Sequence, residues 1–268
     1  MNDLYLYFPQ WQGSGKTNEL LSGAKQIRRM LPNYKWAEVP VTEVEDIFIE
    51  KQILGYESIK NQLERATTLI NKSSPDRIFT VGGGCDVEIA PVSYLNQLYR
   101  GDLNVIWLDA HGDLNTPQSS PSKNFHGMPL RLLMGDGDTD LLSFVQQPLN
   151  YHQVFLAGVR DLDQPEKMYL ESNHMSITDL SNGSAVNLLG KQLTGKNLYV
   201  HVDLDVINPA LFPHVKCPTK NGVTIDSLLE FIKLLKNVGN IVGGSVVEFV
   251  PSESGHTKLP SELFNLLV

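Results

Sequence analysis

The chain reads Val-Ile-Trp-Leu-Asp-Ala-His-Gly-Asp-Leu-Asn-Thr-Pro from Val105 to Pro117. Its apolar first part, residues 105–108, predicts a buried strand of a parallel sheet. Asp109, His111 and Asp113 follow and alternate with an alanine and a glycine. If the extended backbone continues, these three side chains leave the strand end on one side. Open α/β sheets place their chemistry at this end, and two carboxylates with an imidazole suit a divalent cation. The alternative is a polar turn after a buried strand.

Length and composition limit the classes of function. The 268 residues suit one large domain or two small ones with a substantial core. The net charge of −8 and the pI near 5.3 argue against nucleic acid and against an anionic membrane surface. The two cysteines, Cys85 and Cys217, suit a reducing compartment. Because neither a signal peptide nor an apolar stretch of membrane-spanning length is predicted, we expect a cytoplasmic protein without nucleic-acid or membrane partners.

Strand-like and helix-like segments alternate along the chain. Apolar and β-branched runs predict strands at residues 4–8, 35–39, 77–81, 104–108, 153–157, 174–177, 197–202 and 241–247. Amphipathic periodicity predicts helices at residues 18–30, 56–70, 125–134, 224–236 and 261–267, with another opening after residue 84. This alternation predicts one α/β domain over residues 1–268, with a largely parallel sheet and helices on both faces.

A second pair of carboxylates follows the predicted strand 197–202. Asp203 and Asp205 are two residues apart, so an extended backbone points both side chains the same way. Four aspartates and a histidine at two strand ends would repel one another strongly without cations between them. Two divalent ions would remove this repulsion and lower the pKa of a water that bridges them.

Four motifs then occur in a fixed order. They are Asp109-Ala-His111-Gly-Asp113, Ser122-Lys-Asn124-Phe-His126-Gly127, Asp203-Leu-Asp205 with Pro209, and Glu248 before Val250-Pro251. In this order they resemble the ureohydrolase family, which holds arginases, agmatinases and formimidoylglutamases. The resemblance implies a three-layer α/β/α sandwich around an eight-stranded, mainly parallel sheet. It also implies two divalent metal ions, manganese in that family, and a homo-oligomer, either a trimer or a hexamer.

The resemblance further implies a set of metal ligands. One ion would take Asp109, His111, Asp203 and Asp205. The second ion would share Asp109 and Asp203, and would add Asp113 and a histidine that follows a pair of glycines.

Cys85 stands where the family has that histidine, in Gly82-Gly83-Gly84-Cys85-Asp86. A thiolate is softer than an imidazole and prefers zinc, iron or cobalt to manganese. Its negative charge would also raise the pKa of a water between the ions. Asp86 replaces a small hydroxyl residue and adds another acid. The three glycines let the backbone turn tightly or approach another group closely. The alternative for Cys85 is a buried, inert cysteine.

The loop after Asp113 resembles that of arginases and implies a site for an amino acid. Asn115 and Ser122 would bind the substrate carboxylate, and Ser120 and Asn124 would lie nearby.

Other residues are implied to contact the rest of the substrate. Asp163 and Glu166 would meet its α-amino group. Glu248 would accept the guanidinium, whose planar fork suits a carboxylate. His126 would carry a proton to the leaving amine, because an imidazole titrates near neutrality. Asp113 joins His126 and Glu248 in the implied catalytic set.

We therefore expect hydrolysis of a guanidino compound, first of all L-arginine to urea and L-ornithine, by a hydroxide between two metal ions. One alternative is an amidine hydrolase of the agmatinase or formimidoylglutamase type. Another is a member without metal and with weak or no catalysis that acts as a binding or assembly protein, which Cys85 favours and which Glu248 and His126 oppose. The remaining histidines are expected at the surface or in packing: His152, His174, His201, His214 and His256.

Overall fold

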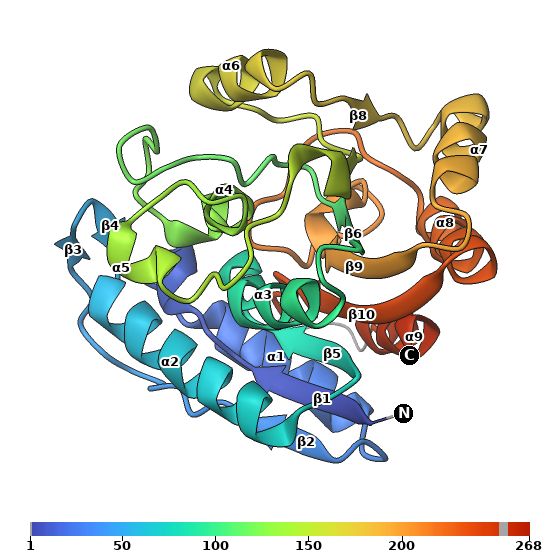
Figure 1. Cartoon of the computed structure of the whole chain (residues 1–268). Coiled ribbons are helices and arrows are strands. Elements are labelled where there is room, and N and C mark those ends of the chain that lie inside the picture. The colour runs from blue at the N-terminus through green and yellow to red at the C-terminus, as the bar shows by residue number, and fades with distance from the viewer. Residues whose placement is uncertain (1, 252–256) are drawn as a thin grey trace.

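Eight strands form one sheet in the computed structural model of the chain, which describes residues 2–251 and 257–268. All neighbouring strands run parallel, in the order β2-β1-β5-β10-β9-β6-β7-β8 (Figure 1). This confirms the predicted eight-stranded parallel sheet. The strands are β1 (Asp3–Phe8), β2 (Trp36–Glu38), β5 (Arg77–Gly82), β6 (Leu103–Leu108), β7 (Val154–Ala157), β8 (Ile177–Thr178), β9 (Asn197–Asp203) and β10 (Asn240–Val247).

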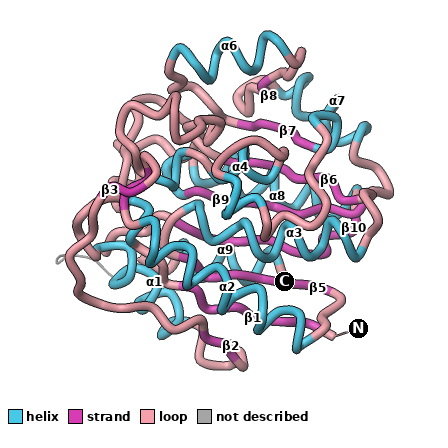
Figure 2. The backbone as a smooth tube through the Cα atoms, turned by 60° about the vertical axis from the view of Figure 1, so that its left-hand side comes forward, coloured by secondary structure: helices cyan, strands magenta, loops and turns pink. Residues whose placement is uncertain are grey.

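Helices cover both faces of the sheet and complete three layers (Figure 2). Helices α2 to α6 contribute buried apolar residues to the core on one face, and α1, α7, α8 and α9 contribute to the core on the other. The three-layer α/β/α sandwich is therefore confirmed. The helices are α1 (Glu19–Met30), α2 (Tyr56–Ser73), α3 (Ile89–Leu98), α4 (Pro129–Leu133), α5 (Thr139–Leu142), α6 (Gln164–Ser172), α7 (Gly183–Gln192), α8 (Ile225–Val238) and α9 (Leu259–Leu267).

Strand β6 is apolar along residues 105–108 and does not alternate polar and apolar residues as a surface strand does. Val105 and Trp107 point into one core, and Ile106 and Leu108 point into the other. All four side chains are fully buried. A parallel strand covered on both faces needs an unbroken apolar run, because both sets of alternating side chains are buried.

Several short elements differ from the prediction. The predicted helix 125–134 is divided into a 3₁₀ turn (Phe125–Gly127) and α4, which starts at Pro129 because proline has no backbone N–H to donate. Helices α6 and α7, and the hairpin formed by β3 (Ile49–Glu50) and β4 (Ile53–Leu54), were not predicted. The last strand on the β8 edge comprises Ile177 and Thr178 instead of residues 174–177.

The four central strands β5, β10, β9 and β6 end side by side at one edge of the sheet. Their carboxyl ends lead into the segments that carry Cys85, Glu248, Asp203 and Asp109. The fold therefore brings together residues that are more than 160 positions apart in the sequence. Within the described part of the chain, every helix is too short or too polar to cross a membrane.

Candidate active site and metal centre

Asp109 and His111 lie at the carboxyl end of β6. Asp109 is fully buried, and its Oδ1 accepts a hydrogen bond from the His111 backbone N–H at 2.6 Å. Its Oδ2 accepts one from Nε1 of Trp107 at 3.1 Å. The imidazole Nδ1 of His111 lies 2.9 Å from Oδ2 of Asp205. Burial opposes the charged imidazolium, but hydrogen bonds to Asp109 and Asp205 outweigh burial and raise the pKa of His111.

The second carboxylate pair lies at the end of the neighbouring strand β9. Oδ1 of Asp203 accepts a hydrogen bond from the Asp205 backbone N–H at 2.7 Å. Oδ1 of Asp205 accepts one from the Ala110 N–H at 3.0 Å, which ties the β9 end to the β6 end. Both aspartates are buried. The predicted convergence of the two acidic motifs is therefore present in the structure.

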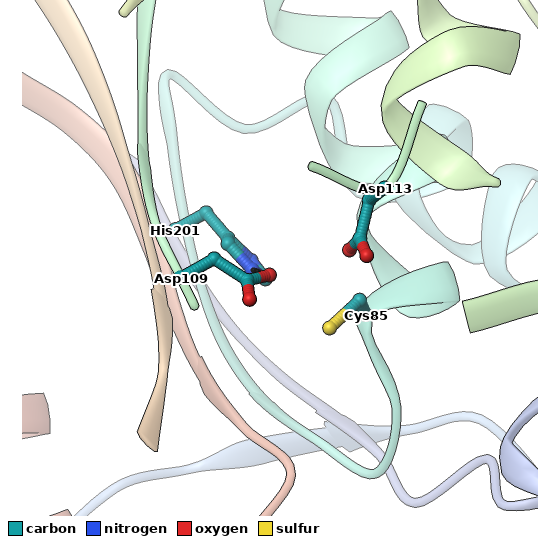
Figure 3. A group of neighbouring side chains, drawn as sticks. All are labelled: Cys85, Asp109, Asp113 and His201. Carbon is teal, nitrogen blue, oxygen red and sulfur yellow. Dashed lines mark ion pairs between the residues drawn. The ribbon is translucent and has the colours of Figure 1, made fainter. Parts of the chain in front are cut away.

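Cys85 and Asp113 complete one side of this group. Sγ of Cys85 lies 3.1 Å from Oδ2 of Asp203 and 3.9 Å from Oε1 of Glu248. Figure 3 shows the side chains of Cys85 and Asp113 directed toward Asp109 across a shared space. Oδ2 of Asp113 is buried and has no hydrogen-bond partner among the described residues. These groups form a set of N, O and S donors that share one space.

The glycines before Cys85 are required by the chain's own packing. A Cβ at Gly83 would lie 1.7 Å from the carbonyl oxygen of Gln10, and one at Gly84 would lie 2.4 Å from Oγ of Ser14. The loop after β1 therefore presses against the loop after β5. Of the two possibilities for these glycines, the structure shows a close approach.

The carboxylates of the site repel one another. Burial and the neighbouring carboxylate of Asp109 raise the pKa of Asp113 well above its usual range. Burial and the carboxylate of Asp205 do the same for Asp203, and burial and Asp109 raise the pKa of Asp205 to about 6. Divalent cations among these oxygens would supply the positive charge that protons otherwise supply. The donor set therefore fits metal ions.

Glu248 and His126 form a pair beside the acidic group. Oε1 of Glu248 lies 3.0 Å from Nδ1 of His126 and 3.2 Å from Oγ of Ser14. Oε2 of Glu248 is buried and has no hydrogen-bond partner among the described residues. Burial opposes the charged imidazolium of His126, but the Glu248 carboxylate outweighs burial and raises the pKa of His126.

Two site residues have strained backbones. The φ angle is 53° at Asp113 and 60° at Glu248. Such left-handed conformations cost a non-glycine residue on the order of 1–3 kcal/mol and cluster at functional sites. At both residues the turn directs a carboxylate into the shared space.

A cavity of about 200 Å³ lies between these groups and the loop after β6. Asn124 is not among the described residues that line it. The described residues predicted for the site that line the cavity are Cys85, His111, Asp113, Asn115, Ser120, Ser122, His126, Asp163, Glu166, Asp203, Asp205 and Glu248. Asp109 lies in the wall beneath them and is fully buried.

Asp163 and Glu166 have local structural partners. Nδ2 of Asn115 donates to Oδ2 of Asp163 at 2.8 Å. Asp163 caps the N-terminus of α6, and Glu166 closes the reciprocal capping box. The Glu166 oxygens accept the backbone N–H groups of Leu114, at 3.1 Å, and of Asp163, also at 3.1 Å. The substrate-binding roles assigned to these residues stay predictions.

One histidine that was expected at the surface or in packing lies in the site. His201 is fully buried on β9, with its Nε2 3.6 Å from Oδ2 of Asp109. His201 and Asp203 are two residues apart on one strand, and this spacing was the signal that could have identified it. His152 and His174 are exposed and His214 is half-buried, as expected, whereas His256 lies outside the described residues.

Asp86, the residue directly after Cys85, is also a buried acid. Both of its carboxylate oxygens are buried without a hydrogen-bond partner among the described residues. Burial raises its pKa to about 7. Asp86 packs against Gly13, where a Cβ would lie 2.0 Å from Oδ2.

The sequence of the chain is similar to those of known arginases. An arginase of Staphylococcus aureus strain MSSA476 is 28% identical to this chain over 255 residues. The match covers 89% of this chain and 83% of the relative. An arginase of Bacillus subtilis strain 168 is 26% identical over 225 residues, 80% of this chain and 75% of the relative.

Solved structures show the same fold. The arginase of Entamoeba histolytica, in complex with L-ornithine, superposes with a TM-score of 0.85 at 18% identity, over 99% of this chain and 96% of that one. A formimidoylglutamase of Bacillus subtilis gives a TM-score of 0.72 at 16% identity, over 99% and 84% of the two chains. The sequence model described as "Arginase family" matches residues 14–261. The predicted resemblance is confirmed, and the chain belongs to the arginase family.

Proposed function

We propose that this chain hydrolyses a guanidino compound, with L-arginine as the first candidate, to urea and an amine, which is L-ornithine for that substrate. The observation that carries the proposal is one shared cavity that joins the buried aspartates to the Glu248–His126 pair. Family membership supports an enzyme that acts on guanidino C–N bonds. The arginase of Entamoeba histolytica, which shares the fold, was solved with L-ornithine bound.

The aspartates would hold two divalent ions. His111 with Asp109, Asp203 and Asp205 would hold one ion, and Asp113 with Cys85 would hold the other together with shared aspartates. Such ions make a water molecule nucleophilic near neutral pH. Manganese is the metal implied by the family resemblance, and the thiol of Cys85 favours zinc, cobalt or iron instead.

Glu248 would bind the guanidinium. Its Oε1 is held by His126 and Ser14, whereas its buried Oε2 has no partner among the described residues and is free to accept an N–H. A planar guanidinium donates two parallel hydrogen bonds to a carboxylate. This contact would turn the guanidinium carbon toward the aspartates.

His126 would supply the proton of the leaving group. The Glu248 carboxylate raises the pKa of His126 and so favours the protonated imidazole. When the oxygen of water bonds to the guanidinium carbon, the C–N bond to the alkyl amine breaks, and the amine nitrogen takes a proton from His126. Of the two protons of the water, one returns His126 to its charged form and the other completes the ammonium group, so that guanidinium and water become urea and an alkylammonium ion.

The far end of the cavity would bind the amino-acid part of the substrate. Asn115, Ser120 and Ser122 line it beside Asp163 and Glu166. The cavity volume of about 200 Å³ lies below the range of about 300–1,000 Å³ that is typical of ligand pockets, so it suits only a compact substrate. An α-carboxylate and an α-amino group would distinguish L-arginine from agmatine, which has no carboxylate.

The test is product formation by the purified chain. Urea and formamide are measured with L-arginine, agmatine and formimidoylglutamate, each after loading with manganese, cobalt or zinc. We expect urea from L-arginine at the highest kcat/KM. Urea from agmatine alone, or formamide from formimidoylglutamate alone, would reassign the substrate. If every pairing gives neither product, the chain is a binding or assembly protein and the catalytic proposal is wrong.

Two further properties belong to the proposal. The acidic composition with only two cysteines supports a cytoplasmic location. The family resemblance supports a homo-oligomer, either a trimer or a hexamer, which light scattering after gel filtration measures directly.

A further inference from the structure

His201 is oriented as a metal ligand although it lies outside the motifs that identify the family. It is fully buried on β9, where its ring stacks on Trp107 with centroids 3.7 Å apart. Its Nδ1 lies 2.8 Å from Oε1 of Glu88. Its Nε2 faces Oδ2 of Asp109 at 3.6 Å, which is too long for a hydrogen bond, and has no partner among the described residues. A buried imidazole nitrogen without a partner is costly unless something binds it.

Glu88 fixes the state of this ring. Glu88 also accepts hydrogen bonds from the hydroxyl groups of Tyr199 and Ser245, and both Glu88 and His201 are fully buried. The contact between Nδ1 of His201 and Glu88 leaves Nε2 as the ring nitrogen that faces Asp109. Metal-binding histidines commonly show this arrangement, in which a carboxylate accepts from the nitrogen that does not bind the ion.

The groups around Nε2 have the spacing of one coordination sphere. One ligand atom each from Cys85, Asp109, Asp113 and His201 all lie within 4.8 Å of one another. Figure 3 shows these four side chains pointing into one space from different segments. Ligand atoms about 2.0–2.3 Å from a tetrahedral ion are about 3.3–3.8 Å from one another, so movements of about 1 Å would close the set.

His201 also provides an imidazole near the position where Cys85 replaces the histidine of the family. The segment after β5 provides a thiol at Cys85 where the family resemblance implies an imidazole. His201 provides an imidazole to the same space from β9, two residues before Asp203. The space therefore has its nitrogen donor, supplied by a different strand.

We propose that His201 binds one of the two metal ions through Nε2, together with Cys85, Asp109 and Asp113, and that Glu88 positions its ring. This inference rests on the proposed function in requiring a metal centre. One nitrogen, one sulfur and two carboxylate groups form a softer set than the implied one of a histidine and aspartates, and they favour zinc, cobalt or iron over manganese at this position.

Diffraction from crystals of the whole chain loaded with zinc or cobalt, with anomalous data at the metal edge, tests the ligand directly. We expect an ion about 2.0–2.3 Å from Nε2 of His201. Ions bound by the aspartates with Nε2 farther than about 3 Å would overturn the role of His201 and leave the proposed function intact. Crystals that bind no ion would overturn both.

Metal content per chain provides an independent test in solution. We expect two ions per wild-type chain and one per chain for His201→Asn, at equal loading and by mass spectrometry of the metal. The matched control, His152→Asn, changes an exposed histidine and should keep two ions. Two ions in His201→Asn with unchanged affinity would overturn the inference.

A rescue variant guards against a fold defect in the single variant. Cys85→His combined with His201→Asn moves the imidazole to the other segment, and it should restore two ions per chain and shift the preference toward manganese. Glu88→Gln should keep both ions but weaken one of them by about 10–100-fold, as expected for a positioning residue. If the rescue variant folds and still binds one ion, the two positions do not serve the same ion and the inference is wrong.

Discussion

Two clusters of charged residues in this protein differ in how their charge is balanced. At the surface, Lys51 lies 2.7 Å from Asp140 and 3.9 Å from Asp138, and Lys60 lies 3.3 Å from Asp140. Two carboxylates there face two ammonium groups. We call these four residues the surface cluster.

The buried site has no such balance. Five carboxylates lie beside three imidazoles at the proposed metal centre, so acidic groups outnumber imidazoles even before Asp163, Glu166 and Glu88 are counted. The carboxylates are Asp109, Asp113, Asp203, Asp205 and Glu248, and the histidines are His111, His126 and His201. The charge of the surface cluster is balanced within the chain, whereas the buried site would be balanced by protons or, as proposed above, by metal cations.

Metal loading should produce the largest effect. With free metal at 1,000 times its Kd, each bound ion adds about 4 kcal/mol to the free energy of unfolding, so that two ions add about 8 kcal/mol. For a chain of this size we expect Tm to rise by more than about 10 °C, measured by calorimetry with and without chelator. Lys51→Met should show the same rise, because the surface cluster does not bind the metal. An unchanged Tm with manganese, cobalt and zinc would contradict the difference between the clusters.

His126→Asn should lower kcat for urea release by about 10²–10⁴-fold, because the leaving amine loses its proton donor. Metal content should stay at the wild-type level, since His126 contacts Glu248 and is not in the proposed ligand sets. Steady-state kinetics on metal-loaded protein measures the change, with the exposed His152→Asn as control. A variant with wild-type kcat would remove His126 from the proposed chemistry.

Cys85→His should change metal preference more than stability. Replacing the sulfur donor by nitrogen hardens the ligand set and favours manganese over zinc. Competition between the two metals, followed by the metal content of the recovered protein, measures the shift. If the ratio of bound zinc to bound manganese is the same in the wild type and in Cys85→His, Cys85 does not bind the metal.

Lys51→Met should have the smallest effect. The side chains of Lys51 and Asp140 are exposed, and water and salt screen their attraction. We expect the midpoint of urea-induced unfolding to stay close to that of the wild type, at both low and high salt. A large loss of stability would show that the surface cluster contributes more than screened ion pairs do.

Much of the fold follows from local sequence pattern. Continuous apolar runs such as residues 105–108 predict buried parallel strands. All eight predicted strands are present in the sheet, although the edge strands β2 and β8 have no buried residue. Helix α6 was missed because its start signal, the reciprocal pair Asp163 and Glu166, was interpreted through the family resemblance as substrate binding. Helix α7 was missed because its buried face is small, with only Leu189 and Gly190 fully covered.

The acidic motifs of the site were also predictable, because Asp109, His111 and Asp113 lie together at the end of one strand. Other contacts depend on strand order, which local pattern does not contain. Glu248 meets His126 only because β10 lies between β5 and β9. His201 was set aside because a single histidine in an apolar strand resembles a packing residue, and only the structure shows its nitrogen facing Asp109.

Titration calorimetry of the metal-free chain with manganese, cobalt or zinc tests the central claim most directly. Burial and neighbouring carboxylates raise the pKa of Asp113 and of Asp203 and favour their protonated forms, so we expect metal binding to displace protons and the measured enthalpy to depend on the ionisation enthalpy of the buffer. We predict saturation at two ions per chain with net proton release. If none of the three metals shows saturable binding, the account is contradicted.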